Sequence, residues 1–420
     1  DDLDVEAHVH YFLGCLHGHL PAAFASLDST RMTLVYFAVS GLDLIGALDR
    51  ADRHAVVEWV YAQQVAPEGA QGLGGFRGGP AAGLELAEDG ATPASPLDGP
   101  HLAMTYAALA TLAILGDGLR RVEREAVLAG VRALQLPDGS FQGHADGEAD
   151  VRFVFCAAAI SALLGDSGRW HGLNRDAAVG RLVACVTYEG GFGMAPGQEA
   201  HGGTTYCALA ALALLDALDA LPCRAAAVRW CAGRQVGGFQ GRANKEEDTC
   251  YSWWVGASLA ILGEKRLILR APTAAFTCAC QYHKGGLSKY VGEPPDPLHS
   301  YFAICGLSLV GHEAVRDVEP TLGISARAWR AHTRTLLQLQ ADVALPPGAR
   351  CAWLSPPSLR ADTASALEVA RWLRLALGSS ISRLCVDSTA LLTACAMAAL
   401  AGAAGLIARG SRAAGAQPGS

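Results

Sequence analysis

The sequence lacks an excess of basic residues. It has 33 Lys and Arg against 40 Asp and Glu, which gives a formal net charge of −7. Proteins that bind nucleic acid carry a basic patch or stripe, so we expect no nucleic-acid partner. The first residues, Asp1 to Asp4, are mostly acidic and lack the basic and then apolar regions of a secretory signal. We therefore expect a cytoplasmic protein.

Little of the sequence alternates between apolar and polar residues as a half-buried strand does. Few segments are rich in Val, Ile and Thr at that period, whereas Ala and Leu recur at helical spacing, as between Met104 and Leu115. Hydrophobic residues make up 51% of the 420 residues, enough for a sizeable buried core. These features predict an all-α globular fold.

The cysteines do not indicate a disulfide framework. There are 13, an odd number, and most lie in apolar helical runs such as Phe155 to Ala158, as reduced core thiols do. The uncharged segment from Ser388 to Ala408 is long enough to cross a bilayer. Because it consists mainly of Ala, Gly, Ser and Thr, its insertion would be weak. We expect a tail or a packed helix there.

A glycine-rich turn that ends in an aromatic or aliphatic residue recurs along the chain. These glycine turns end at Phe76, Phe141, Phe192, Phe239 and Leu287, at intervals of 65, 51, 47 and 48 residues. A glutamine precedes most of them: Gln63 or Gln64, Gln135, Gln235 and Gln281. The intervals suit a repeat of two helices, in which glycine permits the tight turn and the following side chain packs back onto the helices.

Composition also suggests where the repeat region ends. The stretch from Glu68 to Pro100 is rich in Gly, Pro and Ala and is typical of a long surface loop. The glycine turns stop before about Asp342, where the sequence becomes rich in Ala and Arg. We expect a catalytic domain at 1–341 and a C-terminal extension of unknown structure at 342–420.

Residues with metal-binding chemistry surround the fourth glycine turn. Asp248 precedes Cys250 by two positions, and Arg242 and Lys245 lie just upstream. Together with His299, these two residues could form a three-ligand zinc site whose fourth position stays open, as catalytic zinc requires. Spacing alone leaves another interpretation open, because a cysteine in a helix is usually a small buried hydrophobic residue.

From about His8 to Leu309, through these turns, the sequence resembles the beta subunits of protein prenyltransferases. The resemblance implies an α/α toroid, a barrel of about six helical hairpins, which works as a heterodimer with an alpha subunit. It implies one Zn²⁺, bound by Asp248, Cys250 and His299, that activates the thiol of a protein cysteine. The residues that match the family's prenyl diphosphate site are His201, Arg242, Lys245, Tyr251, Lys289, Trp254 and Tyr106.

Further residues match positions that set specificity in this family: Thr33, Phe37, Arg152, Leu298 and Phe302. Lys289 stands where farnesyl enzymes have an aspartate that helps to bind Mg²⁺, so Mg²⁺ is not expected to be required. Thr33 stands where they have a bulky Trp. Both positions resemble the type I geranylgeranyl enzymes, which implies geranylgeranyl diphosphate as donor and C-terminal Cys-a-a-X proteins, with X mainly Leu or Phe, such as small GTPases. For Arg152 and Tyr106, an ordinary surface arginine and core tyrosine remain alternatives.

Several other functions remain open. The chain could belong to a farnesyltransferase or a Rab geranylgeranyltransferase, or it could be an inactive scaffold with the same fold. Class II terpene cyclases also use helical barrels with glycine and aromatic repeats. Those enzymes need an Asp-x-Asp-Asp acid, and no such motif occurs within the repeat region.

Overall fold

A computed structural model describes residues 3–16, 28–65, 73–80, 99–166, 168 and 170–344. The chain divides into a compact unit, Asp1–Gln340, and a second unit, Ala341–Ser420. The segment 388–408 and nearly all of the predicted extension 342–420 lie outside the described residues, so both expectations stay predictions. Much of the expected loop between Glu68 and Pro100 is likewise not described.

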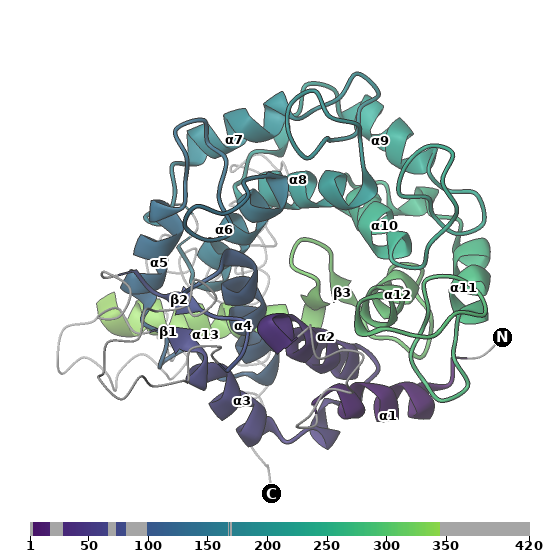
Figure 1. Cartoon of the computed structure of the whole chain (residues 1–420), viewed down its shortest axis with the longest axis horizontal. Helices are drawn as coiled ribbons and strands as arrows, with labels where there is room; N and C mark the ends of the chain where they lie inside the picture. Colours follow the sequence, from purple (N-terminus) through teal and green to yellow (C-terminus); the bar gives the residue numbers. More distant parts are fainter. Residues whose placement is uncertain are drawn as a thin grey trace, which may run out of the picture. The chain divides into compact units, whose positions relative to one another are not determined.

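Helices of the first unit form two concentric rings (Figure 1). The inner helices are α2 (Arg31–Leu44), α4 (Leu102–Leu115), α6 (Val151–Leu163), α8 (Gly202–Leu214), α10 (Tyr251–Ile261) and α12 (Pro297–Leu309), and the outer helices are α1 (Val5–Leu16), α3 (Arg53–Ala62), α5 (Arg124–Ala133), α7 (Arg175–Ala184), α9 (Arg224–Ala232) and α11 (Arg270–Ala279). Each inner helix contacts the next, and α12 contacts α2. The ring therefore closes, which confirms the predicted α/α toroid of six helical pairs.

Other elements of the described residues are short, apart from α13 (Ala326–Ala344). Strand β1 (Gln64–Val65) pairs antiparallel with β2 (Gly75–Phe76), and β3 (Val318–Glu319) with β4 (Ile324–Ser325). The 3-10 helices are η2 (Leu48–Arg50), η5 (Leu218–Ala220) and η6 (Lys265–Leu267). Among the helices of the described residues, none combines the length and apolar character that a membrane crossing requires.

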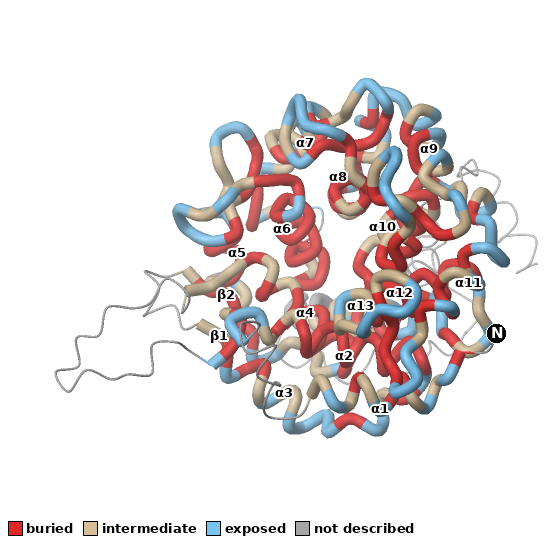
Figure 2. Tube along the Cα trace, turned by 45° about the vertical axis from the view of Figure 1, so that its right-hand side comes forward, coloured by how far each residue is buried: buried red, intermediate tan, exposed pale blue. Residues whose placement is uncertain are grey.

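The inner helices are apolar on nearly all sides because each lies between two inner neighbours and the outer ring. Figure 2 shows them mostly buried, whereas exposed residues gather on the outer helices and connecting loops. This explains why the sequence of α4 is almost continuously hydrophobic, with no polar stripe. The apolar repeats of the sequence are therefore the wall of the barrel.

The glycine turns connect the outer helices α3, α5, α7, α9 and α11 to the inner helix that follows each. Their final residues, Phe76, Phe141, Phe192, Phe239 and Leu287, are all 0% exposed. Glycine is required where the turn meets the next outer helix. Gly139 has a φ of +85°, and a Cβ there would lie 2.0 Å from the carbonyl oxygen of Ala177. The predicted role of these turns, burial of the repeat's apolar face, agrees with this packing.

Arginine side chains join five outer helices to the inner helices that follow them in the chain. The first residue of each outer helix donates to a carbonyl at the C-terminal end of that inner helix: Arg53 to Gly116, Arg124 to Leu164, Arg175 to Leu215, Arg224 to Leu262 and Arg270 to Val310. Arg316 donates to the carbonyl of Asp43, at the end of α2. These bonds satisfy carbonyls that a helix terminus leaves unpaired.

At the opposite end, backbone bonds join the start of one inner helix to the glycine turn of the next pair: Leu102 N to Gly143 O, Val151 N to Met194 O and Gly202 N to Gly241 O. Thr249 N donates to Lys289 O at 3.2 Å in the same way. The inner helices therefore run in one direction, and the turns before them lie together at one end of the barrel. All predicted metal ligands are at this end.

Candidate metal centre and active site

Asp248 and Cys250 are held by the backbone at the start of α10. The amide of Asp248 donates to the carbonyl of Phe239 at 3.1 Å. The amide of Cys250 donates to Asp248 Oδ1 at 2.9 Å, so the carboxylate fixes the turn that leads into α10. Thr249 Oγ1 donates to Ser288 O at 2.8 Å. This segment is thus fixed to the glycine turn that carries Lys289.

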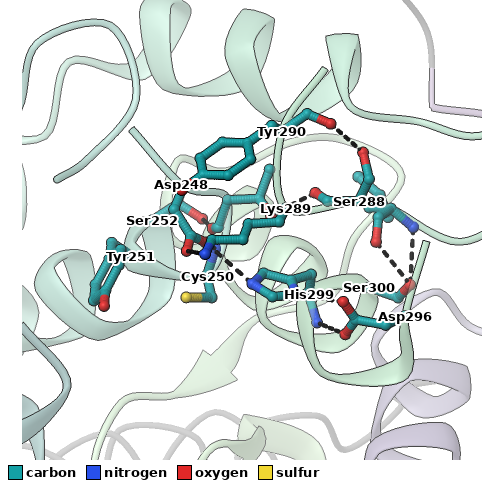
Figure 3. Close-up of polar contacts among 12 residues, drawn as sticks. Asp248, Cys250, Tyr251, Ser252, Ser288, Lys289, Tyr290, Asp296, His299 and Ser300 are labelled. Atoms are coloured by element: carbon teal, nitrogen blue, oxygen red, sulfur yellow. Dashed lines mark hydrogen bonds and ion pairs between the residues drawn. The ribbon is translucent and has the colours of Figure 1, made fainter. Parts of the chain in front are cut away.

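His299 enters the same site from α12 (Figure 3). Asp296 caps this helix by accepting the amide of His299 at 2.9 Å, and Pro297 occupies its first turn. The other oxygen of Asp296 lies 2.5 Å from His299 Nδ1, which leaves Nε2 directed at Asp248 Oδ1, 3.3 Å away. A second carboxylate that fixes the ring of a ligand histidine is a common feature of metal sites.

Asp248, Cys250 and His299 form a cluster that could hold a metal ion. Their ligand atoms all lie within 4.8 Å of one another, and Asp248 and Cys250 are buried. Oxygen, sulfur and nitrogen donors in a set of three are those of a catalytic zinc site, so these residues fit zinc. A structural, purely apolar role for Cys250 does not account for a carboxylate and an imidazole beside it.

The pKa values of the three groups reflect their proximity without a cation. Burial raises the pKa of the Cys250 thiol well above its usual range, and the charge of Asp248 raises it further. Burial opposes ionisation of Asp248, but its bonds to His299 and Cys250 outweigh that effect and lower its pKa. Burial also disfavours the charged form of His299, yet Asp248 and Asp296 raise its pKa to about 9. In the absence of a cation, a proton on His299 supplies positive charge to this cluster. A divalent cation would supply that charge instead.

Lys289 lies at the rim of this cluster. Its Nζ is 4.0 Å from Asp248 Oδ2 and 4.9 Å from the centre of the Tyr290 ring. A hydrogen bond with Tyr290 raises the pKa of the ammonium, and Asp248 adds to the shift. Lys289 is therefore a positive charge beside the candidate metal centre.

Two further predicted residues, His201 and Tyr251, contact each other. Tyr251 Oη is 2.9 Å from His201 Nε2, and His201 Nδ1 accepts the amide of Gly203 at 3.2 Å. Burial and the charge of Arg242 lower the pKa of His201, so its ring is neutral near pH 7 and its proton lies on Nε2. Tyr251 therefore accepts from His201, and its own hydroxyl proton is directed elsewhere.

Both predicted cationic side chains, Arg242 and Lys245, are accessible to solvent. Arg242 forms an ion pair with Glu199 at 3.0 Å, with 41% of its side chain exposed. Lys245 is exposed, three residues further along the same turn. Both lie on the loop before α10, and Arg242 is close enough to influence the pKa of Tyr251. Glu199 was not identified from the sequence.

Aromatic rings form a closed belt inside the barrel, with two rings from α2 and one from each of the other inner helices. Neighbouring centroids are 5.5 Å apart for Tyr36 and Tyr106, 5.3 Å for Tyr106 and Phe155, 5.6 Å for Phe155 and Tyr206, 5.1 Å for Tyr206 and Trp254, and 4.2 Å for Trp254 and Phe302. Phe37 lies 5.4 Å from Phe302 and 5.7 Å from Tyr36, which completes the circle. This aromatic belt includes three of the predicted lipid-contacting residues, Tyr106, Trp254 and Phe302.

Comparison with known proteins agrees with this arrangement. The family described as "Prenyltransferase alpha-alpha toroid domain" matches residues 3–324. The chain belongs to this prenyltransferase family.

Two relatives of the prenyltransferase family are named "Geranylgeranyl transferase type-1 subunit beta". The protein of Arabidopsis thaliana is 37% identical over 77% of this chain and 89% of its own length, and that of Dictyostelium discoideum is 38% identical over 74% and 92%. A "Protein farnesyltransferase subunit beta" of Schizosaccharomyces pombe is 33% identical over 74% of this chain and 79% of its own. The predicted resemblance to type I beta subunits is confirmed.

A solved structure of the same family has a similar fold. The "Candida albicans protein geranylgeranyltransferase-I complexed with GGPP" superposes with a TM-score of 0.68 at 25% identity, covering 80% of this chain and 100% of that one. The family assignment makes this chain a subunit of a prenyltransferase enzyme. The relatives' names favour a prenyltransferase over a class II terpene cyclase as the interpretation of the glycine turns.

The remaining predicted residues of this prenyltransferase chain lie around the belt and the site. Phe37 is buried against Tyr301, with centroids 5.1 Å apart, and Thr33 Oγ1 lies 3.5 Å from Met104 Sδ. Leu298 is 38% exposed beside His299. Arg152 is half-exposed and pairs with Asp150 at 2.6 Å and Glu148 at 2.9 Å. None of these positions is tested by the comparisons, so their roles stay predictions.

Sequence reasoning missed two kinds of residue. The sequence does indicate a role for Asp296, because an Asp followed directly by Pro is typical of a capped helix start. Tyr36, Phe155 and Tyr206 belong to the belt but were not named as site residues. Aligning the repeats on the ends of their glycine turns would have found Phe155 and Tyr206, since each lies 14 residues after its turn's final Phe.

Proposed function

We propose that this chain is the catalytic beta subunit of a type I protein geranylgeranyltransferase. It transfers geranylgeranyl from geranylgeranyl diphosphate to the cysteine thiol of proteins that end in Cys-a-a-X, where X is mainly Leu or Phe. The observation that carries the proposal is the cluster of Asp248, Cys250 and His299 with Lys289 at its rim. Relatives with the type-1 name support the choice within the family.

Zinc is the metal that best suits this cluster. Asp248, Cys250 and His299 would hold it, and Asp296 would keep the His299 ring in the required orientation. Bound zinc lowers the pKa of a thiol ligand, so that the thiolate nucleophile is present at neutral pH. Three protein ligands leave a position for a substrate thiol.

Other residues of the chain act on the leaving group. When the thiolate sulfur bonds to C1 of the lipid, the C1–O bond breaks and the diphosphate keeps the electron pair. Tyr251 can donate its hydroxyl proton to this anion because His201 occupies the hydroxyl's acceptor side. Arg242 and Lys245 add positive charge from the same loop, and Lys289 adds it from the next turn. Lys289 takes the place of a divalent cation, so we expect no requirement for Mg²⁺.

The aromatic belt is the surface on which we place the isoprenoid. Its rings offer apolar area just below the metal centre, because Trp254 lies one helical turn beyond Cys250 on α10. The small side chain of Thr33, beside Met104, leaves room for a fourth isoprene unit. Phe37 and Leu298 provide an apolar surface for the last peptide residue, and Arg152 a charge for the peptide.

The proposal includes partners and a location. We expect an alpha subunit as the partner in a heterodimer, small GTPases with Cys-a-a-Leu ends as substrates, and the cytoplasm as the compartment. The similarity to two proteins that are named as beta subunits supports the first of these.

The test is transfer of geranylgeranyl and, separately, farnesyl to a peptide ending in Cys-a-a-Leu, with the chain co-purified with an alpha subunit. We expect geranylgeranyl transfer and about one zinc per heterodimer. Cys250→Ala should abolish both. Cys231→Ala is the matched control, since Cys231 is also buried, on α9, but lies outside the cluster.

Other outcomes would identify the alternatives. A preference for farnesyl diphosphate or a strict need for Mg²⁺ would show a farnesyltransferase. Transfer only to proteins presented by an accessory protein would show a Rab enzyme. A stable heterodimer without zinc and without transfer would show an inactive scaffold.

A further inference from the structure

The loop between β3 and β4 lies across the inside of the ring. Figure 1 shows this hairpin within the circle of inner helices. Strand β3 contacts α12, and β4 contacts α2 and α4. The loop residues Pro320 to Gly323 therefore reach the interior at the level of the aromatic belt.

Three tyrosine hydroxyls hold the backbone of this loop. Tyr106 donates to Leu322 O at 2.6 Å, and Tyr301 donates to Gly323 O. Tyr36 Oη lies 3.1 Å from Gly323 O, 3.0 Å from Tyr106 Oη and 2.8 Å from Tyr301 Oη. Since Tyr36 and Tyr106 belong to the aromatic belt, the belt and the loop are fixed to each other by one hydrogen-bonded cluster.

Gly323 leaves no free space between the loop and the rings. It has a φ of +67°, and a Cβ there would lie 2.8 Å from Tyr36 Oη, 3.0 Å from Tyr301 Oη and 3.5 Å from Trp253 Cζ2. Leu322 beside it is fully buried. The loop is thus packed against residues of α2, α10 and α12 at once, and its height relative to the belt is determined by close contacts.

Polar groups mark the loop as the end of an apolar surface. Thr321 Oγ1 donates to Glu319 Oε1 at 2.9 Å, and both side chains are partly exposed. Burial raises the pKa of Tyr206, a belt residue on α8, and the carboxylate of Glu319 is close enough to add to that shift. A hydrocarbon chain that extended past the belt would remove water from the Glu319 carboxylate without offering it a hydrogen bond.

We propose that the loop 319–323 is the stop for the far end of the isoprenoid, and that the hydroxyl cluster of Tyr36, Tyr106 and Tyr301 sets the longest chain the enzyme accepts. This inference rests on the proposed function. Loss of a hydroxyl lets the loop recede and admits a longer chain. A side chain at position 323 pushes the loop and the rings together and favours a shorter one.

The experiment compares kcat/KM for diphosphates with three, four and five isoprene units, using the heterodimer and one Cys-a-a-Leu peptide. For Tyr301→Phe we expect the ratio of five-unit to four-unit transfer to rise about fivefold, the effect of one hydrogen bond. For Gly323→Ala we expect the ratio of three-unit to four-unit transfer to rise. Tyr61→Phe is the matched control, because Tyr61 bonds to Asp117 between the outer helix α3 and the end of α4, away from the belt.

The outcomes separate this inference from the proposed function. If the unaltered enzyme transfers no prenyl group, the proposed function fails. If it does transfer geranylgeranyl but Tyr301→Phe keeps the same chain-length ratios as Tyr61→Phe, the loop is not the stop. If the melting temperature of Gly323→Ala shows that this variant does not fold, Tyr36→Phe replaces it. For Tyr36→Phe we expect the ratio of five-unit to four-unit transfer to rise, as for Tyr301→Phe.

Discussion

The seam that closes the ring gives a quantitative prediction. His8 on α1 is 0% exposed and joins the first helix to the fifth glycine turn. Its Nδ1 accepts the amide of Gly286 at 3.0 Å, and its Nε2 lies 3.1 Å from Gln281 Oε1, which also accepts the amide of Asp4. Both ring nitrogens are used, so the ring must be neutral with its proton on Nε2.

Replacing His8 by Ala should destabilise the protein strongly. An unpaired buried amide at Gly286 costs about 1–3 kcal/mol, and the cavity left by the ring adds a comparable amount. A total of about 3 kcal/mol corresponds to a fall in melting temperature of roughly 4 °C for a unit of this size. His10→Ala is the matched control, because His10 lies on the same helix with 67% of its side chain exposed, and it should change the melting temperature by little.

The same site predicts a pH dependence. Burial lowers the pKa of His8 below its ordinary 6.5, only partly opposed by Gln281 and Asp4. The stabilisation is therefore complete above about pH 6.5 and is lost as the pH falls below it, because the unfolded chain takes up a proton that the folded site resists. His8→Asn can still accept the amide of Gly286 through Oδ1 but does not titrate.

Melting temperatures of the wild type, His8→Ala, His8→Asn and His10→Ala, measured at one protein concentration and scan rate, test this reasoning. The advantage of the wild type over His8→Asn should shrink between about pH 8 and pH 5.5. Equal melting temperatures for His8→Ala and His10→Ala would refute the energetic argument. A pH-independent difference would refute the assigned protonation state.

Three more predictions concern the site. Asp296→Ala should weaken zinc binding by about 10–100-fold in a chelator competition, whereas Asp52→Ala, which removes the equivalent cap of α3, should not; equal affinities would contradict the role of Asp296 in orienting His299. Tyr251→Phe should lower the single-turnover rate by about 10–100-fold, the value of a hydrogen bond to a charged group, and an unchanged rate would remove Tyr251 from the leaving-group site. Transfer by the wild type should not respond to Mg²⁺, whereas Lys289→Ala should lose activity and regain part of it when Mg²⁺ is added.

Local signals in the sequence were sufficient for much of the fold. The glycine turns located five of the six helical pairs, because positions such as Gly139 need both a positive φ and close approach to the next outer helix. Glutamines before the turns were noted without a role. In the structure Gln135 bonds to the backbone of Asn174, and Gln281 to that of Asp4. These contacts link successive repeats. The periodicity of the glutamines could therefore indicate the repeat, but not the residue to which each glutamine bonds.

Closure of the ring could not be derived from the repeats. The bonds that close it join His8 to Gly286 and Arg316 to Asp43, and each crosses more than 270 residues of sequence. An open array of the same repeats would show the same periodicity. Closure was therefore expected only from the family resemblance. The metal cluster likewise could not be derived from local sequence signals. His299 is 49 residues after Cys250, and no local feature indicates that the two side chains meet.

The direction of the inner helices explains why an anionic leaving group suits the end of the barrel where the metal ligands lie. Each helix start carries about half a positive charge, and α8, α10 and α12 begin at the same end, joined by the bonds between Gly202 and Gly241 and between Thr249 and Lys289. One carboxylate, Asp248, is buried among them. An ammonium at Lys289 adds positive charge at a fixed position without an exchangeable cation. In the proposed reaction, the repeat architecture would supply the electrostatic field for diphosphate departure, because it forces the inner helices to run in one direction. We expect single substitutions at Lys289 or Tyr251 to change this field.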